Sequence, residues 1–285
     1  MTYTTLISAA ELKALGVSGQ PFMLFDCSFD LMKPADGAGL YREAHIPGAV
    51  YANLDTDLST HAAERASGGR HPLPTREAFA QWLASVGFGN GMQAVVYDRN
   101  GANYCGRLWW MLKWAGHDAV AVLDGGLQAW QGAGEPVAVG TEPARAAGSF
   151  QLQPALRRLV DADRVLADLG RPAQTLIDAR GAPRFRGETE PLDPVAGHIP
   201  GALNRPFTQN FASDGRFKSP AELRAEFDTL LAGRDPASVV HHCGSGVSAI
   251  PNVLAMEIAG LGQPALFAGS WSEWCSDASR PFAQG

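Results

Sequence analysis

Several features that mark special classes of protein are scarce or missing in this chain of 285 residues. Cysteine occurs only four times, at Cys27, Cys105, Cys243 and Cys275, with no C-x-x-C pair. This scarcity argues against a disulfide scaffold and against a zinc site, and it fits a reducing compartment. We therefore expect a cytoplasmic protein, and we predict no metal and no cofactor.

Long apolar and basic segments are missing as well. No stretch of about 18 apolar residues occurs, and residues 1–16 lack a basic region followed by an apolar core, so we expect neither a membrane span nor an export signal. Lys and Arg total 23 against 29 Asp and Glu and form no run. Nucleic acid and membranes are therefore poor partners, whereas a small anionic substrate needs only a local site.

The chain does contain an internal repeat. HIPGAV at 45–50 returns as HIPGAL at 198–203, about one domain length later. Three more pairs follow in the same order: LFDCSF (24–29) with LIDARG (176–181), AVVYD (94–98) with VVHHC (239–243), and LDGGLQAW (123–130) with FAGSWSEW (267–274). This register predicts two duplicated domains, at 1–140 and 152–285, joined by a linker rich in Gly, Pro and Ala at roughly 135–155.

Each half alternates short apolar runs with amphipathic stretches. The apolar runs predict buried strands at 23–26, 94–98, 175–178 and 238–242, and the helical spacing predicts helices at 106–116 and 248–260. Such alternation predicts an α/β fold in which each domain has a central parallel sheet flanked by helices. Ligands of these sheets bind at the carboxyl ends of the strands, where Cys243 lies.

The loop from Cys243 to the following helix carries the candidate chemistry. Gly244 and Gly246 can adopt positive φ, so that successive N–H groups, including those of Val247 and Ser248, turn inward and form a cradle for an anion. The helix N-terminus favours a thiolate, and the same cradle would hold a persulfide. The alternative is that Cys243 is a buried small hydrophobic residue. The first half has Asp98 at this position, so we predict that only the second half is catalytic.

The two HIPGA segments, CGSGVSA (243–249), LIDARGAPRFRG (176–187) and GSWSEW (269–274) give the chain a clear resemblance. It resembles the rhodanese superfamily over essentially its whole length, and most closely the 3-mercaptopyruvate sulfurtransferases. The resemblance implies two rhodanese-like domains of which the second is catalytic. It also implies that sulfane sulfur moves from mercaptopyruvate to Cys243, that pyruvate leaves, and that a thiol, a thioredoxin-like protein or cyanide accepts the sulfur.

The resemblance also implies roles for residues outside the cysteine loop. Asp55, His71 and Ser245 match a hydrogen-bonded relay that moves protons near the leaving carbon. Taken singly, each would be an ordinary turn, surface or loop residue. Arg184 matches the arginine that binds the donor's carboxylate. Arg186 would point to the opposite side if the chain is extended there.

The chain departs from the family pattern at two places. A second arginine common between RFRG and GHIPG is replaced by Leu192, which puts donor affinity and even donor identity in doubt. His242 replaces a small residue before the cysteine and could tune the thiolate. His45 and His198 occupy equivalent places in both halves, so we interpret both as structural.

Other interpretations stay open at this point. A thiosulfate sulfurtransferase is the alternative within the class. A phosphatase of the related cysteine-loop type would need an arginine where the chain has Ala249. A non-catalytic module of two rhodanese-like domains is disfavoured by the retention of Cys243. Cys105 as the nucleophile is disfavoured because it lies outside the equivalent loop.

Overall fold

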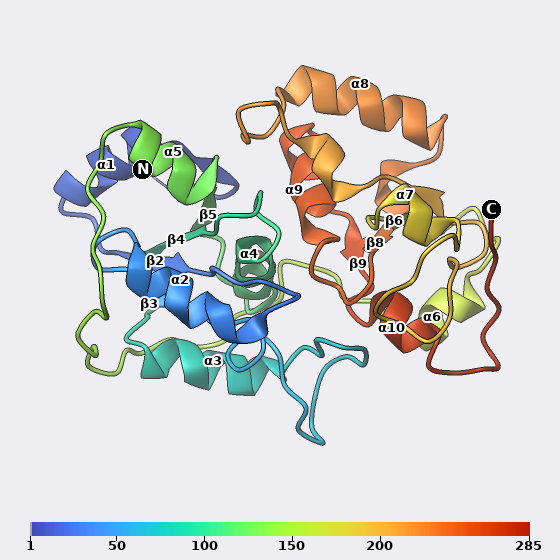
Figure 1. The fold of residues 1–285 in the computed structure, drawn as a ribbon, viewed down its shortest axis with the longest axis horizontal. Coiled ribbons are helices and arrows are strands. Elements are labelled where there is room, and N and C mark those ends of the chain that lie inside the picture. The colour runs from blue at the N-terminus through green and yellow to red at the C-terminus, as the bar shows by residue number, and fades with distance from the viewer. Residues whose placement is uncertain (1) are drawn as a thin grey trace. The chain divides into compact units, whose positions relative to one another are not determined.

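The computed structural model describes residues 2–285 and divides into two compact units (Figure 1). Unit 1 contains the chain up to Glu64, then Pro74–Leu156 and Asp214–Arg216. Unit 2 contains Arg65–Leu73, Arg157–Ser213 and Phe217–Gly285. The segment Arg65–Leu73 therefore comes from the first half of the sequence but packs within the second unit. The ranges 1–140 and 152–285 stay our proposed domain boundaries.

Unit 1 is built on a parallel sheet of five strands in the order β1-β5-β4-β2-β3. The strands are β1 (Leu6–Ile7), β2 (Phe22–Asp26), β3 (Val50–Tyr51), β4 (Gln93–Tyr97) and β5 (Val120–Leu123). The helices are α1 (Ala9–Val17), α2 (Gly37–Glu43), α3 (Arg76–Ser85), α4 (Cys105–Trp114) and α5 (Gly126–Gly132), with a 3₁₀ turn at Pro34–Asp36.

Helices cover both faces of this sheet because successive side chains of a strand point to opposite sides. Leu24 of β2 packs in a cluster with Leu12 of α1 and Trp130 of α5. The next residue, Phe25, contacts Trp82 of α3, with the ring centroids 6.0 Å apart. All residues of α4 are buried, as its nearly continuous apolar sequence predicts. The predicted α/β architecture is thereby confirmed for this unit.

Unit 2 has a parallel sheet of four strands in the order β7-β6-β8-β9. The strands are β6 (Thr175–Asp178), β7 (Leu203–Asn204), β8 (Val239–His242) and β9 (Ala265–Leu266). The helices are α6 (Ala162–Ala167), α7 (Ala182–Phe185), α8 (Pro220–Leu231), α9 (Ile250–Ile258) and α10 (Ser270–Trp274), with 3₁₀ turns at Phe207–Asn210 and Pro236–Ser238. This order matches β3-β2-β4-β5 of unit 1, as a duplication predicts.

The two faces of the second sheet are covered in the same manner. Val240 packs in a cluster with Val165 of α6 and Trp271 of α10, whereas the neighbouring His241 contacts Phe227 of α8. Helix α8 begins at a capping box in which Ser219 and Glu222 satisfy each other's backbone N–H groups. The burial of both faces explains why the strands are continuous apolar runs.

The histidines of the two HIPG segments have equivalent roles. His45 Nδ1 lies 2.9 Å from the carbonyl oxygen of Tyr41, and its ring stacks on Tyr41. His198 Nδ1 lies 2.8 Å from the carbonyl oxygen of Phe185, and its ring stacks on Phe185. Each histidine ties its segment to the preceding helix, which confirms the structural interpretation of both.

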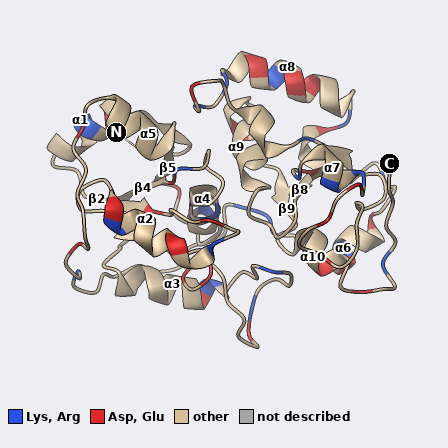
Figure 2. Cartoon of the chain, viewed as in Figure 1, with Lys and Arg blue, Asp and Glu red and all other residues tan. Residues whose placement is uncertain are grey.

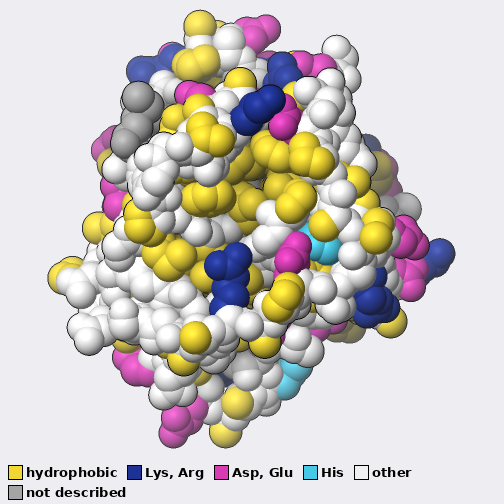
Figure 3. Space-filling model, turned by 90° about the vertical axis from the view of Figure 1, so that its left-hand side faces the viewer, with side chains coloured by type: hydrophobic (Ala, Val, Ile, Leu, Met, Phe, Trp, Pro, Cys, Tyr) yellow, Lys and Arg dark blue, Asp and Glu magenta, His cyan; other side chains and the backbone are white. Residues whose placement is uncertain are grey.

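Charged residues of both signs occur throughout the described chain. Lys and Arg are interspersed with Asp and Glu in both units (Figure 2). Hydrophobic side chains gather on the face that is turned to the left in Figure 1 (Figure 3). Among residues 2–285, no helix combines the length and the apolar character that a membrane crossing requires.

Candidate active site

Cys243 lies at the carboxyl end of β8, one of the two central strands of the second sheet. The loop that follows leads directly into α9, and the sulfur-bearing residue is only 2% exposed. Gly246 has φ of 74°, and a Cβ atom there would lie 2.1 Å from the carbonyl oxygen of Ala268. This turn therefore requires glycine, and the turn directs the loop around the cysteine.

The loop presents backbone donors that have no acceptor. Among the described residues, none accepts a hydrogen bond from the N–H groups of Gly244, Val247 or Ser248. Gly244 and Val247 are buried, and buried N–H groups without partners are rare because each costs free energy. A set of them in one loop at a helix N-terminus is typical of a site that binds an anion.

Unit 1 shows how the equivalent loop is filled when no cysteine is present. Asp98 follows β4 as Cys243 follows β8, and its carboxylate accepts hydrogen bonds from four backbone N–H groups. The donors and their distances are Asn100 (2.9 Å), Ala102 (3.2 Å), Tyr104 (2.8 Å) and Cys105 (3.0 Å). A side-chain anion thus fills the loop of the first half, whereas in the second half the N–H groups of Gly244, Val247 and Ser248 have no acceptor among the described residues.

The beginning of α10 fixes the position of Cys243. The N–H of Cys243 donates to Ser270 Oγ at 3.0 Å, and the N–H of Trp271 donates to the carbonyl oxygen of Cys243 at 3.0 Å. Ser270 adopts φ of 55°, a left-handed conformation that costs about 1–2 kcal/mol for a residue with a Cβ. The equivalent residue of unit 1 is Gly126, with φ of 59°. The second half has a serine at a position that favours glycine, and that serine anchors the cysteine backbone.

We expect Ser270→Ala to destabilise the protein, because it leaves the buried N–H of Cys243 without its acceptor. The loss should be about 1–3 kcal/mol of unfolding free energy, measured by urea denaturation. The exposed Ser276→Ala is the control and should change stability by less than about 0.5 kcal/mol. Equal stability of Ser270→Ala and the unmodified protein would contradict this role.

Two of the three residues assigned to a relay are brought together within unit 2. His71 Nδ1 lies 2.7 Å from Ser245 Oγ, and both side chains are buried. The segment that carries His71 is held by the N–H of Arg70, which donates to Ser272 Oγ at 3.0 Å. Asp55 belongs to unit 1, where burial raises the pKa of its carboxyl. The part of Asp55 in the relay stays a prediction.

Arg184 lies beside the cysteine loop. A Cβ atom on Gly244 would be 3.5 Å from Arg184 Nη1. The guanidinium donates to both carboxylate oxygens of Glu190, at 2.6 and 3.1 Å, and to Asp193 Oδ2 at 3.2 Å. Burial raises the pKa of Glu190, but hydrogen bonds from Arg184 and the backbone outweigh that effect, so the net pKa is lowered. Glu190 is therefore ionised beside the arginine.

The backbone around Arg186 is helical and not extended. The chain forms the short helix α7 from Ala182 to Phe185, and Arg186 is its C-terminal cap. A proline in the first turn and the cap after a single turn account for this short helix. Arg186 is exposed and pairs with Glu188, whereas Arg184 pairs with Glu190 and Asp193.

Arg70, Glu190 and Asp193 were missed by sequence reasoning. Arg70 immediately precedes His71, and its Nη2 would lie 3.1 Å from a Cβ on Gly244. It forms an ion pair with Asp193. The only signal in the sequence was the position of Arg70 next to His71 of the HPLP segment, and nothing local linked it to the carboxylates more than a hundred residues away.

The remaining cysteines and His242 differ from what a nucleophilic centre needs. Burial raises the pKa of Cys27 and Cys105 well above the usual range, and it also raises that of Cys275. These thiols are therefore protonated near neutral pH. Burial also lowers the pKa of His242, and neither ring nitrogen has a hydrogen-bond partner in the described part of the chain. His242 is thus neutral, and its effect on Cys243 stays a prediction.

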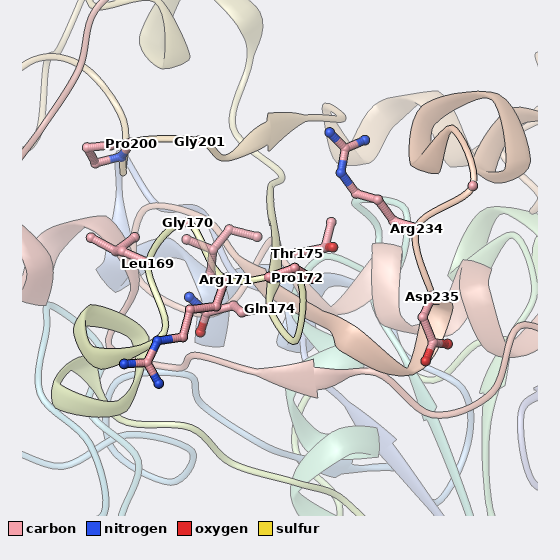
Figure 4. Close-up of a pocket in the computed structure, with 12 residues that line it drawn as sticks. Leu169, Gly170, Arg171, Pro172, Gln174, Thr175, Pro200, Gly201, Arg234 and Asp235 are labelled. Atoms are coloured by element: carbon pink, nitrogen blue, oxygen red, sulfur yellow. The ribbon is translucent and has the colours of Figure 1, made fainter.

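A pocket lies at the opposite edge of the second sheet. Figure 4 shows Gly170, Arg171, Thr175, Pro200, Arg234 and Asp235 around it. Thr175 is the first residue of β6, so this pocket lies at the amino ends of the strands. It contains none of the residues singled out above, and ligands of parallel sheets bind at the other edge.

Comparison with known proteins agrees with this geometry. The model of the rhodanese-like domain matches twice, at residues 8–133 and 161–277. A Pseudomonas aeruginosa protein with the provisional name 3-mercaptopyruvate sulfurtransferase is 46% identical over 286 residues, covering 100% of both chains. A Mycobacterium tuberculosis protein with the provisional name thiosulfate sulfurtransferase is 40% identical over 284 residues, covering 98% of this chain and 97% of its own. The solved structure of 3-mercaptopyruvate sulfurtransferase from Leishmania major has a TM-score of 0.80 at 31% identity, over 96% of this chain and 74% of that one.

These matches cover both halves and the whole length of close relatives. The chain belongs to the rhodanese family and consists of two rhodanese-like domains.

Proposed function

We propose that the protein is a sulfurtransferase that takes sulfane sulfur from 3-mercaptopyruvate, carries it as a persulfide on Cys243 and passes it to an acceptor thiol. The observation that carries the proposal is the loop of unpaired N–H groups around Cys243, next to the hydrogen-bonded pair of His71 and Ser245. The names of the relatives from Pseudomonas aeruginosa and Leishmania major support the choice of donor.

The chemistry assigns a task to each group. The thiolate of Cys243 attacks the donor's sulfur, and the bond between that sulfur and C3 breaks. Its electron pair stays on C3 as the enolate of pyruvate. The donor's thiol proton is transferred to C3, so pyruvate leaves and an anionic persulfide remains on the cysteine. We assign the transfer of this proton to Ser245 and His71 and the stabilisation of the persulfide to the loop N–H groups.

The donor's charge is matched by arginine. Arg184 has both terminal guanidinium nitrogens beside Gly244, where they can make a charge-assisted contact with the donor's carboxylate. The loop positions after the cysteine, Gly244 and Ser245, carry no charge. A leaving enolate needs a proton more than a cation, so this neutral loop favours mercaptopyruvate.

Thiosulfate is the second candidate donor, because the relative from Mycobacterium tuberculosis is named for it. Its leaving group is sulfite, a compact anion whose departure is helped by cations near the sulfur. A cation at about 4 Å contributes roughly 1–4 kcal/mol, depending on the effective dielectric. Both arginines near Gly244 are already paired with carboxylates, which weakens this help.

We expect kcat/KM for mercaptopyruvate to exceed that for thiosulfate by at least about tenfold, or roughly 1.4 kcal/mol, with one common acceptor. Ser245→Lys should shift the preference towards thiosulfate, because it places a cation in the loop and removes the hydroxyl of the relay. Ser276→Lys, at an exposed position outside the loop, is the control and should leave the donor preference unchanged. A preference of the unmodified protein for thiosulfate would refute the donor and leave the Cys243 chemistry standing.

The acceptor and the compartment complete the proposal. We propose a small thiol or a thioredoxin-like protein as acceptor, since a persulfide is transferred by thiolate attack on its outer sulfur. All four cysteines are free thiols, which suits the reducing cytoplasm.

A further inference from the structure

The donor site predicted from sequence lacks one cation. The resemblance to the family implies that Leu192 takes the place of a second carboxylate-binding arginine, so Arg184 alone would face an anionic donor. The structure places a different arginine, Arg70, beside Gly244. Arg70 comes from the segment Arg65–Leu73, which packs within unit 2 although it belongs to the first half of the sequence.

Arg70 and Arg184 converge on the residue after Cys243. A Cβ atom on Gly244 would lie 3.1 Å from Arg70 Nη2, and 3.5 and 3.6 Å from the two terminal nitrogens of Arg184. Both side chains are partly exposed, at 25% and 21%. Two guanidinium groups from separate segments therefore lie beside the residue that follows Cys243.

The two arginines already hold a carboxylate between them. Asp193 pairs through Oδ1 with Arg70 Nη1 and through Oδ2 with Arg184 Nη2 at 3.2 Å. The spacing of the pair thus suits a carboxylate that places one oxygen on each arginine. Arg70 Nε is buried and has no hydrogen-bond partner among residues 2–285, so the guanidinium has donor capacity left.

The charges of this cluster balance before a donor binds. Arg70 and Arg184 face Asp193 and Glu190, and Arg180, which also pairs with Glu190, is balanced by Asp178. Burial raises the pKa of Asp193 even though Arg70 and Arg184 oppose that effect. An anionic donor must therefore displace one of the two carboxylates from the arginines. Asp193 is the easier one to displace, since the backbone N–H groups of Leu192 and Asp193 hold Glu190 in addition to Arg184.

We propose that Arg70 is the second donor-binding arginine and substitutes for the side chain missing at Leu192. The donor's carboxylate takes the place of the Asp193 carboxylate, with one oxygen on Arg70 and one on Arg184. This inference rests on the proposed function, because it concerns the donor of that same reaction. It makes Arg70 a residue that determines specificity for a carboxylate donor.

The test compares donors with and without a carboxylate. We expect Arg70→Gln to raise KM for mercaptopyruvate by about tenfold or more, with kcat changed by less than about threefold. Arg70→Lys should recover part of the loss. With mercaptoacetone, which has the same thiol and ketone but no carboxylate, Arg70→Gln and the unmodified protein should form the Cys243 persulfide at equal single-turnover rates.

Arg65→Gln is the control, an exposed arginine of the same segment, and it should leave both donors unaffected. An unchanged KM in Arg70→Gln would overturn the inference. So would an equal loss with both donors, since that would show a merely structural role for Arg70. Failure of the unmodified protein to release pyruvate from mercaptopyruvate would instead refute the proposed function.

Discussion

Cys243→Ser is expected to turn over no sulfur donor above background, a loss of about 10⁴-fold or more. A serine hydroxyl stays protonated at neutral pH and cannot carry a sulfane sulfur. The other cysteines cannot replace Cys243, because burial raises the pKa of Cys27, Cys105 and Cys275 and keeps their thiols protonated. The measurement is pyruvate release from mercaptopyruvate in the presence of excess thiol.

Cys275→Ser provides the matched control for this variant. Cys275 is the only one of the four cysteines that is not fully buried, so it is the most accessible competitor for the nucleophilic role. We expect its replacement to leave kcat and KM within about twofold of the unmodified protein. If Cys243→Ser still turned over the donor and Cys275→Ser did not, the nucleophile would be Cys275 and not Cys243.

Arg184→Ala is expected to raise KM for mercaptopyruvate by about 10–100-fold, which corresponds to a charge-assisted contact of about 1.5–3 kcal/mol. Because the substitution also removes the partner of Glu190, Arg184→Lys should be measured beside it. The lysine keeps the charge but loses the bidentate hydrogen bonds to Glu190, so its KM should lie between those of the unmodified protein and Arg184→Ala.

The neighbouring arginine of RFRG is the control for this effect. Arg186 caps α7, is exposed and pairs with Glu188, so Arg186→Ala should change KM by less than about twofold. Steady-state kinetics with mercaptopyruvate and a fixed acceptor concentration separate the two variants. Equal rises of KM at both positions would show that the donor is not bound on the side of Arg184.

The fold was predictable because the local patterns agree with the duplication. The apolar runs predicted at 23–26, 94–98, 175–178 and 238–242 match β2, β4, β6 and β8 to within a residue at either end. The helix predicted at 248–260 is α9, and Pro251 lies in its first turn. A short run of apolar residues between turns predicts a buried strand, because both faces of a parallel sheet are covered by helices.

The loop of Cys243 was predictable for a similar reason. A cysteine followed by Gly-x-Gly between a strand and a helix specifies most of its own geometry, so Gly246 and the unpaired N–H groups followed from the sequence. The anchoring of Cys243 by Ser270 did not follow from the sequence. A serine in the left-handed conformation has no local sequence signature, and Cys243 lies 27 residues away from it.

The rest of the site depends on contacts between distant segments. The pairing of His71 with Ser245 spans 174 residues, and that of Arg70 with Asp193 spans 123. No periodicity or motif encodes such a distance, and only the resemblance to the family suggested the first pair. Nothing suggested the pairing of Arg70 with Asp193. The missing arginine at Leu192 indicated that a donor-binding group was lost, and it did not indicate that another segment supplies a replacement.

The most direct measurement of the central claim is mass spectrometry of the intact protein and its peptides after incubation with mercaptopyruvate in the absence of acceptor. The account predicts a gain of one sulfur atom, located on the peptide that contains Cys243, with stoichiometric release of pyruvate and loss of the added sulfur when a thiol is supplied. Pyruvate release without added sulfur on Cys243, or a persulfide on Cys27, Cys105 or Cys275 instead, would contradict it.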